Sequence, residues 1–406
     1  MTVRDLEPRP VTEQARLGDT LREYGRRLAP GELLNLPVLL GLVLIWGIFQ
    51  AANDRFLSPV NLTNLMLQIA ATGMIAIGVV VVLLIGEIDL SVAQVSGLSA
   101  ATMAVLSTTG GVPGPLAILI ALTLGAAIGL FHGLWITRFG VPSFVVTLAG
   151  LLGWLGVQLS VLGRTGTVNL ADPAIIGLAG TFLPPIVGWI GAVAVIAVIS
   201  AAAVLSRRRR AAAGFKPPNT RIFVMRSIVV SLPILGAMAV FNADRGLPLS
   251  VAIFVGFVVL FDLLTTRTRF GRHARALGGN SEAARRAGIA VDRIRVLAFV
   301  LASTMAAAGG ILGASRLLAV NQSSGGSDLL LNVIAAAVIG GTSLFGGRGS
   351  AWSALLGTLV IGSIANGMDL LAVSSNVKFM VTGAVLLIAT TIDAVARRGR
   401  LTAGHA

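Results

Sequence analysis

The chain has 406 residues, of which 55% are hydrophobic and only 12% are charged. Soluble domains carry about 25% charged residues, so the composition excludes soluble enzymes, disordered chains and nucleic-acid-binding proteins despite a net charge of +14. The sequence contains no cysteine, which also excludes disulfide frameworks, thiolate metal sites and cysteine nucleophiles. The apolar majority predicts a chain that is embedded in lipid.

The first apolar stretch begins only after residue 32. Residues 1–30 contain six arginines and five acidic residues, without the apolar stretch that follows a basic start in a signal peptide. We therefore expect 1–32 and 396–406 to be cytoplasmic tails, and 33–395 to form the membrane domain.

Apolar segments recur along the whole membrane domain, each close to the length that crosses a hydrocarbon core of about 30 Å. They predict an all-α polytopic membrane protein of about twelve transmembrane helices. The third, seventh and tenth are short or interrupted by Ser, Gly or Pro, and these are candidates for broken helices that line a cavity. In chain order the segments are 33–51, 64–85, 91–107, 115–137, 142–162, 182–205, 227–241, 249–266, 296–320, 328–345, 351–371 and 378–395.

The basic residues support this count of spans. With both termini in the cytoplasm, 26 of the 31 Lys and Arg residues fall on the cytoplasmic side. Such a skew is the positive-inside rule, and one miscounted span would remove it. The net positive charge therefore reports topology and implies no nucleic-acid partner.

Glycine recurs at every fourth position on two of the predicted spans. Gly125, Gly129 and Gly133 lie on the fourth, and Gly309 and Gly313 on the ninth. Small residues let membrane helices approach closely, so these glycines predict tight helix packing and no ligand site.

The sequence lacks the motifs of ATP hydrolysis and hydrolytic catalysis. A phosphate-binding loop ends in Gly-Lys-Ser/Thr, but Lys216 and Lys378 follow Phe215 and Val377. His132, within a span, has no histidine or serine–aspartate partner at a catalytic spacing. We predict no enzyme activity, no cofactor and no metal site, and any ATP hydrolysis must come from another polypeptide.

An ion-driven carrier is the alternative, and it requires acidic or basic groups that bind the ion within the membrane. The candidate acids all lie within a few residues of a predicted span end, where solvation or helix capping explains them more simply. They are Glu87, Asp89, Asp262, Asp328, Asp369 and Asp393.

The loop 267–295 predicts a short helix outside the membrane. Asn280 suits an N-cap, Glu282 complements the positive end of the helix, and Arg285 with Arg286 complements the negative end. Gly288 supplies a left-handed stop. Such a helix can transmit force from a soluble motor, while a contact with anionic lipid is the simpler interpretation.

Three stretches together resemble the membrane permease of bacterial monosaccharide ABC importers, of the ribose and xylose type, over residues 36–395. The first is Gly-Glu-Ile-Asp-Leu-Ser at 86–91, the second is the loop 276–289, and the third is Ile-Ala-Ala-Ala-Val-Ile-Gly-Gly-Thr-Ser-Leu-Phe-Gly-Gly at 334–347. The family core has about ten spans. A basic loop and hairpin at about 206–248 resembles the longer D-xylose permeases.

The resemblance implies an inner-membrane importer in which two permease copies sit on two ATPase subunits. A periplasmic or extracellular binding protein would deliver a monosaccharide, xylose or a similar pentose or hexose, to loops such as 53–61, 164–172 and 321–327. Within 267–295, a coupling helix at Asn280–Gly288 would contact the ATPase through Glu282, Arg285 and Arg286.

A neutral sugar is best bound by amides and hydroxyls inside the spans, because these groups donate and accept without imposing charge. Hydrogen bonds between helices are the simpler role for each such residue. Asp89 is expected to cap a broken helix beside the path. The candidate pathway residues are Gln68, Asp89, Gln94, Gln158, Asn332 and Asn366.

Overall fold

The computed structural model describes residues 36–214 and 220–403, and in these ranges twelve helices correspond one to one to the predicted spans. Eight of them are long and apolar enough to cross a membrane, and the other four are shorter apolar helices. The all-α polytopic fold is therefore confirmed. In chain order the twelve are α2 (Leu36–Ala52), α3 (Pro59–Leu84), α4 (Val92–Thr108), α5 (Gly114–Phe139), α6 (Ser143–Leu162), α8 (Pro185–Ala212), α9 (Thr220–Asp244), α10 (Leu249–Arg267), α13 (Val291–Leu317), α14 (Ser327–Ile339), α15 (Ala351–Leu370) and α16 (Ser375–Ala403).

Two of the three weak predicted spans are short helices joined to non-helical segments. α4 follows the irregular connection 85–91, and α14 ends at Ile339, from where turns replace the helix that was predicted to continue to residue 345. The seventh predicted span differs, because α9 is continuous and contains Pro233 within it. A proline removes one backbone hydrogen bond without necessarily ending a membrane helix.

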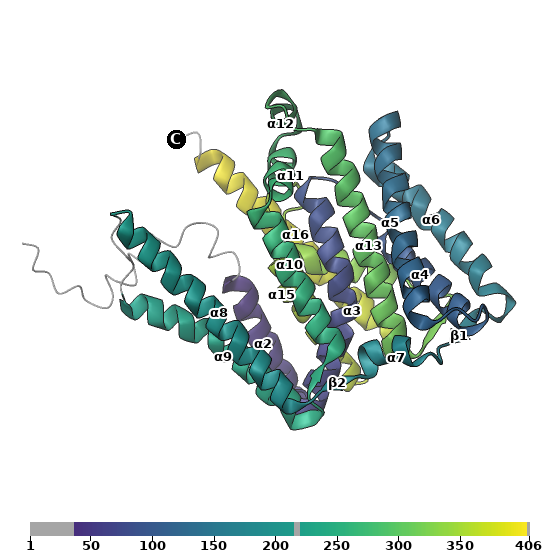
Figure 1. Cartoon of the computed structure of the whole chain (residues 1–406), viewed down its shortest axis with the longest axis horizontal. Helices are drawn as coiled ribbons and strands as arrows, with labels where there is room; N and C mark the ends of the chain where they lie inside the picture. The colour runs from purple at the N-terminus through teal and green to yellow at the C-terminus, as the bar shows by residue number, and fades with distance from the viewer. Residues whose placement is uncertain (1–35, 215–219, 404–406) are drawn as a thin grey trace, which may run out of the picture.

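The bundle is built around α3. In its apolar stretch 89% of residues are buried, against 11% in α8 and in α9. α13 packs against α3, α4 and α5, while α14 and α15 cover another side of α3 (Figure 1). α8 and α9 form a hairpin that leans away from the bundle. The centre is thus packed protein, and the hairpin presents most of its surface outward.

Glycines bring α5 and α13 together. A Cβ built on Gly129 would lie 2.3 Å from the carbonyl oxygen of Phe299, and one on Gly133 would lie 2.7 Å from Val296 Cα. A Cβ on Gly125 would meet Ala307 at 2.6 Å. No side chain fits at these distances, so the predicted close packing of this glycine stripe is confirmed.

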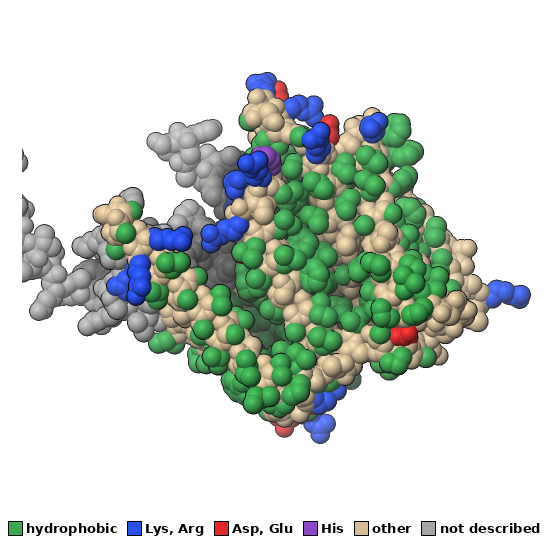
Figure 2. All heavy atoms as spheres, viewed as in Figure 1, with side chains coloured by type: hydrophobic (Ala, Val, Ile, Leu, Met, Phe, Trp, Pro, Cys, Tyr) green, Lys and Arg blue, Asp and Glu red, His purple; other side chains and the backbone are tan. Residues whose placement is uncertain are grey.

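The two ends of the bundle differ in charge and structure. Lys and Arg side chains gather around α11 (Arg269–Gly279) and α12 (Ser281–Arg286) and at the C-terminal end of α8 (Figure 2). We call this the basic end. The other end, the opposite end, carries the short helix α7 (Pro173–Gly180), the 3-10 turn η2 (Gly163–Thr165) and two strand pairs.

Both strand pairs are antiparallel and short. β1 (Thr167–Asn169) pairs with β4 (Ala319–Asn321), with Val168 opposite Val320. β2 (Phe182–Leu183) pairs with β3 (Leu247–Pro248), with Leu183 opposite Leu247. The first pair joins two loops that the sequence analysis assigns to binding-protein contact, 164–172 and 321–327.

Gly129→Ala is expected to lower the free energy of unfolding by about 1–3 kcal/mol, because its Cβ enters a contact that has no space for it. Thermal unfolding of the detergent-purified protein measures this change. The matched control is Gly153→Ala on α6, where a Cβ would meet nothing within 4 Å. Equal stability of the two variants would contradict the proposed packing of α5 on α13.

Candidate functional site

Two consecutive short helices, α11 and α12, connect α10 to α13 at the basic end. Thr268 caps α11, where its hydroxyl accepts a hydrogen bond from the Gly271 amide at 3.4 Å. Asn280 caps α12 by accepting from the Ala283 amide at 2.9 Å. Gly288 follows α12 with a φ of +79°, the left-handed stop that the sequence predicts. The predicted cap and stop of α12 are confirmed, whereas α11 was not anticipated.

The outer face of α12 carries its charges. Glu282 forms an ion pair with Arg286 one turn later, and Arg285 lies 4.0 Å from Asp292 at the start of α13. All four side chains are more than 60% exposed. Exposed pairs of this kind contribute at most about 1 kcal/mol to stability, so these residues are available for contact with another protein.

The α11–α12 unit packs through Gly278 directly against backbone atoms of α3 and of the segment after α14. A Cβ on Gly278 would lie 2.0 Å from the Leu84 carbonyl oxygen and 2.4 Å from the Gly347 amide nitrogen. A Cβ on Gly346 would lie 2.8 Å from Gly86 Cα and 2.6 Å from the Gly278 carbonyl oxygen. The three stretches that carry the family resemblance therefore meet at one point, which we call the glycine contact (Gly86, Gly278, Gly346 and Gly347).

Backbone hydrogen bonding strengthens this contact. The Gly347 amide donates to the Leu84 carbonyl oxygen at 3.0 Å. That carbonyl belongs to the last turn of α3, whose acceptors lack partners within the helix. The segment after α14 thus caps the end of α3, and α11 lies against both.

A buried polar chain begins a few residues beyond Gly86. Asp89 is buried, and its Oδ1 accepts from the Ser91 amide at 2.8 Å and from the Ser91 hydroxyl at 2.6 Å. Ser91 Oγ lies 3.5 Å from Nδ1 of His132 on α5. The Trp154 indole on α6 donates to Nε2 of the same histidine at 3.0 Å. These bonds fix the turn before α4, whose N-cap residue is Ser91, and a capping role of Asp89 beside the path stays a prediction.

In this series of hydrogen-bonded side chains, each group donates to the next, from Trp154 through His132 and Ser91 to Asp89. Because Trp154 donates to Nε2, the proton of a neutral His132 ring is on Nδ1, from where it points to the Ser91 hydroxyl. Ser91 in turn donates to Asp89. These hydrogen bonds join the start of α4 to the last third of α5 and the middle of α6. The three side chains are far apart in the sequence, which is why sequence reasoning missed the link between Ser91, His132 and Trp154.

An ion pair lies beside the connection 85–91 between α3 and α4. Arg295 on α13 is 2.9 Å from the Glu87 carboxylate, and both side chains are mostly buried. It ties the connection 85–91 to the helix that leaves the α11–α12 unit. Glu87 was considered in the sequence only as a possible ion ligand, because its partner is more than 200 residues away.

Three candidate pathway residues lie on helices that adjoin one another. Gln68 is on α3, Gln94 on α4 and Asn332 on α14, and each pair of these helices is in contact. Gln68 and Asn332 are half-buried. Gln94 is buried, and its Oε1 has no hydrogen-bond partner among the described residues. Their role in a pathway stays a prediction.

The other two candidates have partners within the chain. Gln158 on α6 donates to the carbonyl oxygens of Ser324 at 2.8 Å and Asn321 at 3.3 Å, which fixes the loop after β4. Asn366 on α15 exchanges two amide hydrogen bonds with Asn61 on α3, at 2.8 and 3.0 Å. These contacts fit the simpler role considered for each, and pathway contact by either also stays a prediction.

The described part of the chain holds no group of three or more His, Asp or Glu side chains that could bind a metal ion.

A many-helix membrane core with a small helical unit exposed at its basic end defines the class of protein, an all-α polytopic membrane protein. Residues 61–390 match the family described as the permease component of the branched-chain amino acid transport system, and the chain belongs to this family. No solved structure matches the chain.

Curated relatives agree with the resemblance to permeases of the xylose and ribose type. The xylose transport system permease protein of Escherichia coli (strain K12) is 36% identical over 90% of this chain and 93% of its own length. That of Haemophilus influenzae is 34% identical over 88% and 95%. The ribose import permease protein of Bacillus subtilis (strain 168) is 33% identical over 89% and 94%.

Gly278→Ala is expected to loosen the α11–α12 unit, because its Cβ would displace backbone that cannot yield cheaply. A cost of about 1–3 kcal/mol corresponds to amide hydrogen exchange about tenfold faster or more in residues 269–290. Hydrogen–deuterium exchange with mass spectrometry measures it. The adjacent Gly279→Ala is the control, since a Cβ there meets nothing within 4 Å. Unchanged exchange in Gly278→Ala would contradict the contact.

His132→Ala is expected to reduce stability, because it leaves the half-buried Trp154 indole N–H without its acceptor and removes one of the two side-chain partners of the Ser91 hydroxyl. The expected loss is about 1–3 kcal/mol, measured by thermal unfolding in detergent. His273→Ala, on α11 outside this chain of hydrogen bonds, serves as the control. A loss in His273→Ala that equals the loss in His132→Ala would argue against a structural role for the polar chain.

Proposed function

We propose that this chain is the permease subunit of an ATP-driven ABC importer in the bacterial inner membrane, and that it translocates a monosaccharide, xylose or a similar pentose or hexose. Identity of 33–36% to xylose and ribose permeases over about nine-tenths of the chain is the observation that carries the proposal. The family description names branched-chain amino acids, but the curated relatives at 33–36% identity are xylose and ribose permeases.

ATP hydrolysis takes place on a separate ATPase subunit. The sequence has no phosphate-binding loop, and α12 offers that subunit an exposed, charged surface made of Glu282, Arg285 and Arg286. Two permease copies assemble with two ATPase subunits, and both chain termini face the cytoplasm. The gathering of arginines at the end that carries α12 supports this orientation.

Movement of the ATPase reaches the membrane core through the glycine contact. ATP binding draws the two ATPase subunits together and shifts the α11–α12 unit. Because Gly278 rests on the end of α3 and on Gly346 and Gly347, the connection before α4 and the segment after α14 shift with it. Both of these helices are short and adjoin α3. Their displacement opens the path inward, and the energy comes from the differential affinity of the two states for ATP.

The sugar passes with weak polar contacts. Gln68, Gln94 and Asn332 are the side chains best suited to it, because they lie on the three adjoining helices α3, α4 and α14. The unpaired Oε1 of Gln94 is available to accept a sugar hydroxyl. A path that must also release its cargo gains nothing from tight binding.

The binding protein docks at the opposite end. There β1 and β4 hold the loops 164–172 and 321–327 side by side, and Gln158 fixes the second loop from below. Gln158 therefore acts on docking through the loop it supports. Asn366 likewise acts on docking indirectly, through its hydrogen bond to Asn61, which precedes the long central stretch of α3.

The coupling role is tested with Glu282→Ala/Arg285→Ala. Reconstituted in liposomes with the candidate ATPase and a xylose-loaded binding protein, the variant is expected to reduce sugar-stimulated ATP hydrolysis at least about tenfold, because a few charged contacts dominate such interfaces. Its thermal stability should change by less than about 1 kcal/mol, since only exposed ion pairs are lost. Arg138→Ala, a charge removed at the end of α5, is the control.

Two outcomes would count against the proposal. Normal stimulation in the double variant would remove the coupling role of α12. Uptake that needs no ATPase and follows an ion gradient would instead identify an ion-coupled secondary transporter of a small polar solute. A panel of pentoses and hexoses in the same assay then identifies the sugar.

A further inference from the structure

The α8–α9 hairpin has a charge imbalance that neither the proposed coupling surface nor the proposed sugar path uses. Between Pro173 and Ala243 the sequence contains no acidic residue, yet it contains seven basic ones, all within 207–226. Arg208 and Arg209, in the last turns of α8, are exposed. The described residues of the hairpin thus offer positive charge at the basic end with no carboxylate of the hairpin nearby.

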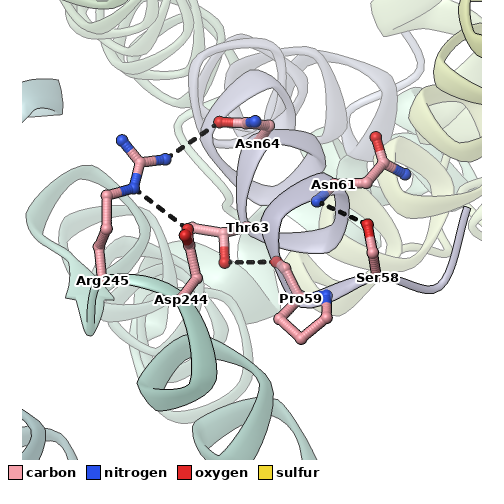
Figure 3. Close-up of polar contacts among 7 residues, drawn as sticks. All are labelled: Ser58, Pro59, Asn61, Thr63, Asn64, Asp244 and Arg245. Atoms are coloured by element: carbon pink, nitrogen blue, oxygen red, sulfur yellow. Dashed lines mark hydrogen bonds and ion pairs between the residues drawn. The ribbon is translucent and has the colours of Figure 1, made fainter. Parts of the chain in front are cut away.

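The hairpin is fastened to the bundle at its opposite end (Figure 3). Arg245 follows α9 and donates to the Asn64 side chain on α3 at 3.2 Å, while its Nε lies 3.1 Å from the Asp244 carboxylate. Its guanidinium also stacks over the Phe182 ring at 4.2 Å. With β2 and β3 paired beside it, this corner fixes the base of the hairpin, and the arms lean outward from there (Figure 1).

A groove of about 390 Å³ runs between the two arms. Its walls include Ser200 and Val204 of α8 and Ser227, Ser231 and Leu232 of α9. Aliphatic side chains border it with much of their surface uncovered, including Leu232 at 68% and Ile228 at 56% exposed. A surface this apolar on membrane-spanning helices faces acyl chains.

The groove and the arginines are adjacent. Arg208 is four residues beyond Val204, which is about 6 Å along the axis of α8 at 1.5 Å per residue. An acyl chain in the groove therefore places its headgroup at the level of the arginines. Serine hydroxyls on both arms are suited to the ester oxygens between chain and headgroup.

We propose that the α8–α9 groove is a binding site for an anionic phospholipid. The headgroup phosphate accepts hydrogen bonds from Arg208 and Arg209, whose planar guanidinium groups match phosphate oxygens, and an acyl chain lies against Val204, Ile228 and Leu232. Charge selects the occupant. A neutral lipid offers no net negative charge to Arg208 and Arg209, and an acidic protein segment has no reason to enter an apolar groove.

Native mass spectrometry of the full-length, delipidated protein tests the site, with phosphatidylglycerol and phosphatidylcholine as the two probes. The wild type is expected to retain phosphatidylglycerol preferentially. Arg208→Gln/Arg209→Gln should weaken that binding about tenfold or more, since each basic residue near an anionic headgroup contributes about 1 kcal/mol. Ser231→Trp fills the groove and should also reduce lipid retention.

The matched control is Arg267→Gln/Arg269→Gln, which removes the same charge from exposed positions at the same end but away from the groove. Equal weakening in this control would show attraction by general surface charge and overturn the site. Equal retention of both lipids by the wild type, or full retention by Ser231→Trp, would also overturn it. Thermal unfolding without added lipid checks that every variant is folded.

Discussion

The contact of backbone with backbone at Gly86, Gly278 and Gly346 sets how the rest of this protein is arranged. A side chain at Gly278 or Gly346 would separate α11 from the end of α3 or from the segment after α14, while Gly86 has a φ of +78°, which favours glycine. The contact joins three stretches that are distant in the sequence, and it lies between the exposed charges of α12 and the buried core. A rigid, side-chain-free contact transmits displacement better than flexible side chains do, because close-packed backbone has little room to yield.

The elements around this contact differ in how much of their surface is packed against the rest of the protein. α3 is almost wholly buried, and α13 packs against α5 so closely that the glycines at the contact leave no room for a side chain. The connection 85–91 is fixed by the Glu87–Arg295 ion pair on one side and by the Asp89–Ser91–His132–Trp154 chain on the other. The α8–α9 hairpin, in contrast, is attached at its base and largely exposed beyond it. The proposed transport path and the proposed lipid site therefore use separate parts of the chain.

Much of the architecture could be predicted from the sequence because membrane helices are encoded locally. Apolar length and the positions of arginines gave twelve spans, and local capping rules gave Asn280 and Gly288 of α12. What could not be predicted depends on partners far apart in the chain. His132 gives no local signal, since its partners are 41 and 22 residues away. The two strand pairs are only two or three residues long, and α11 lacks the apolar pattern of a span.

The central claim is that α12 and the α3–α4 connection move as one body when the ATPase binds ATP. Because the chain has no cysteine of its own, spin labels attach only to cysteines that are introduced by substitution. Double electron–electron resonance on the spin-labelled Ala283→Cys/Ile88→Cys variant, within the reconstituted importer, gives the distance between α12 and that connection. Our account predicts that this distance is the same with and without ATP, while the distance from Ala283→Cys to Val43→Cys on the peripheral helix α2 changes. A change between Ala283 and Ile88 as large as that between Ala283 and Val43 would contradict it.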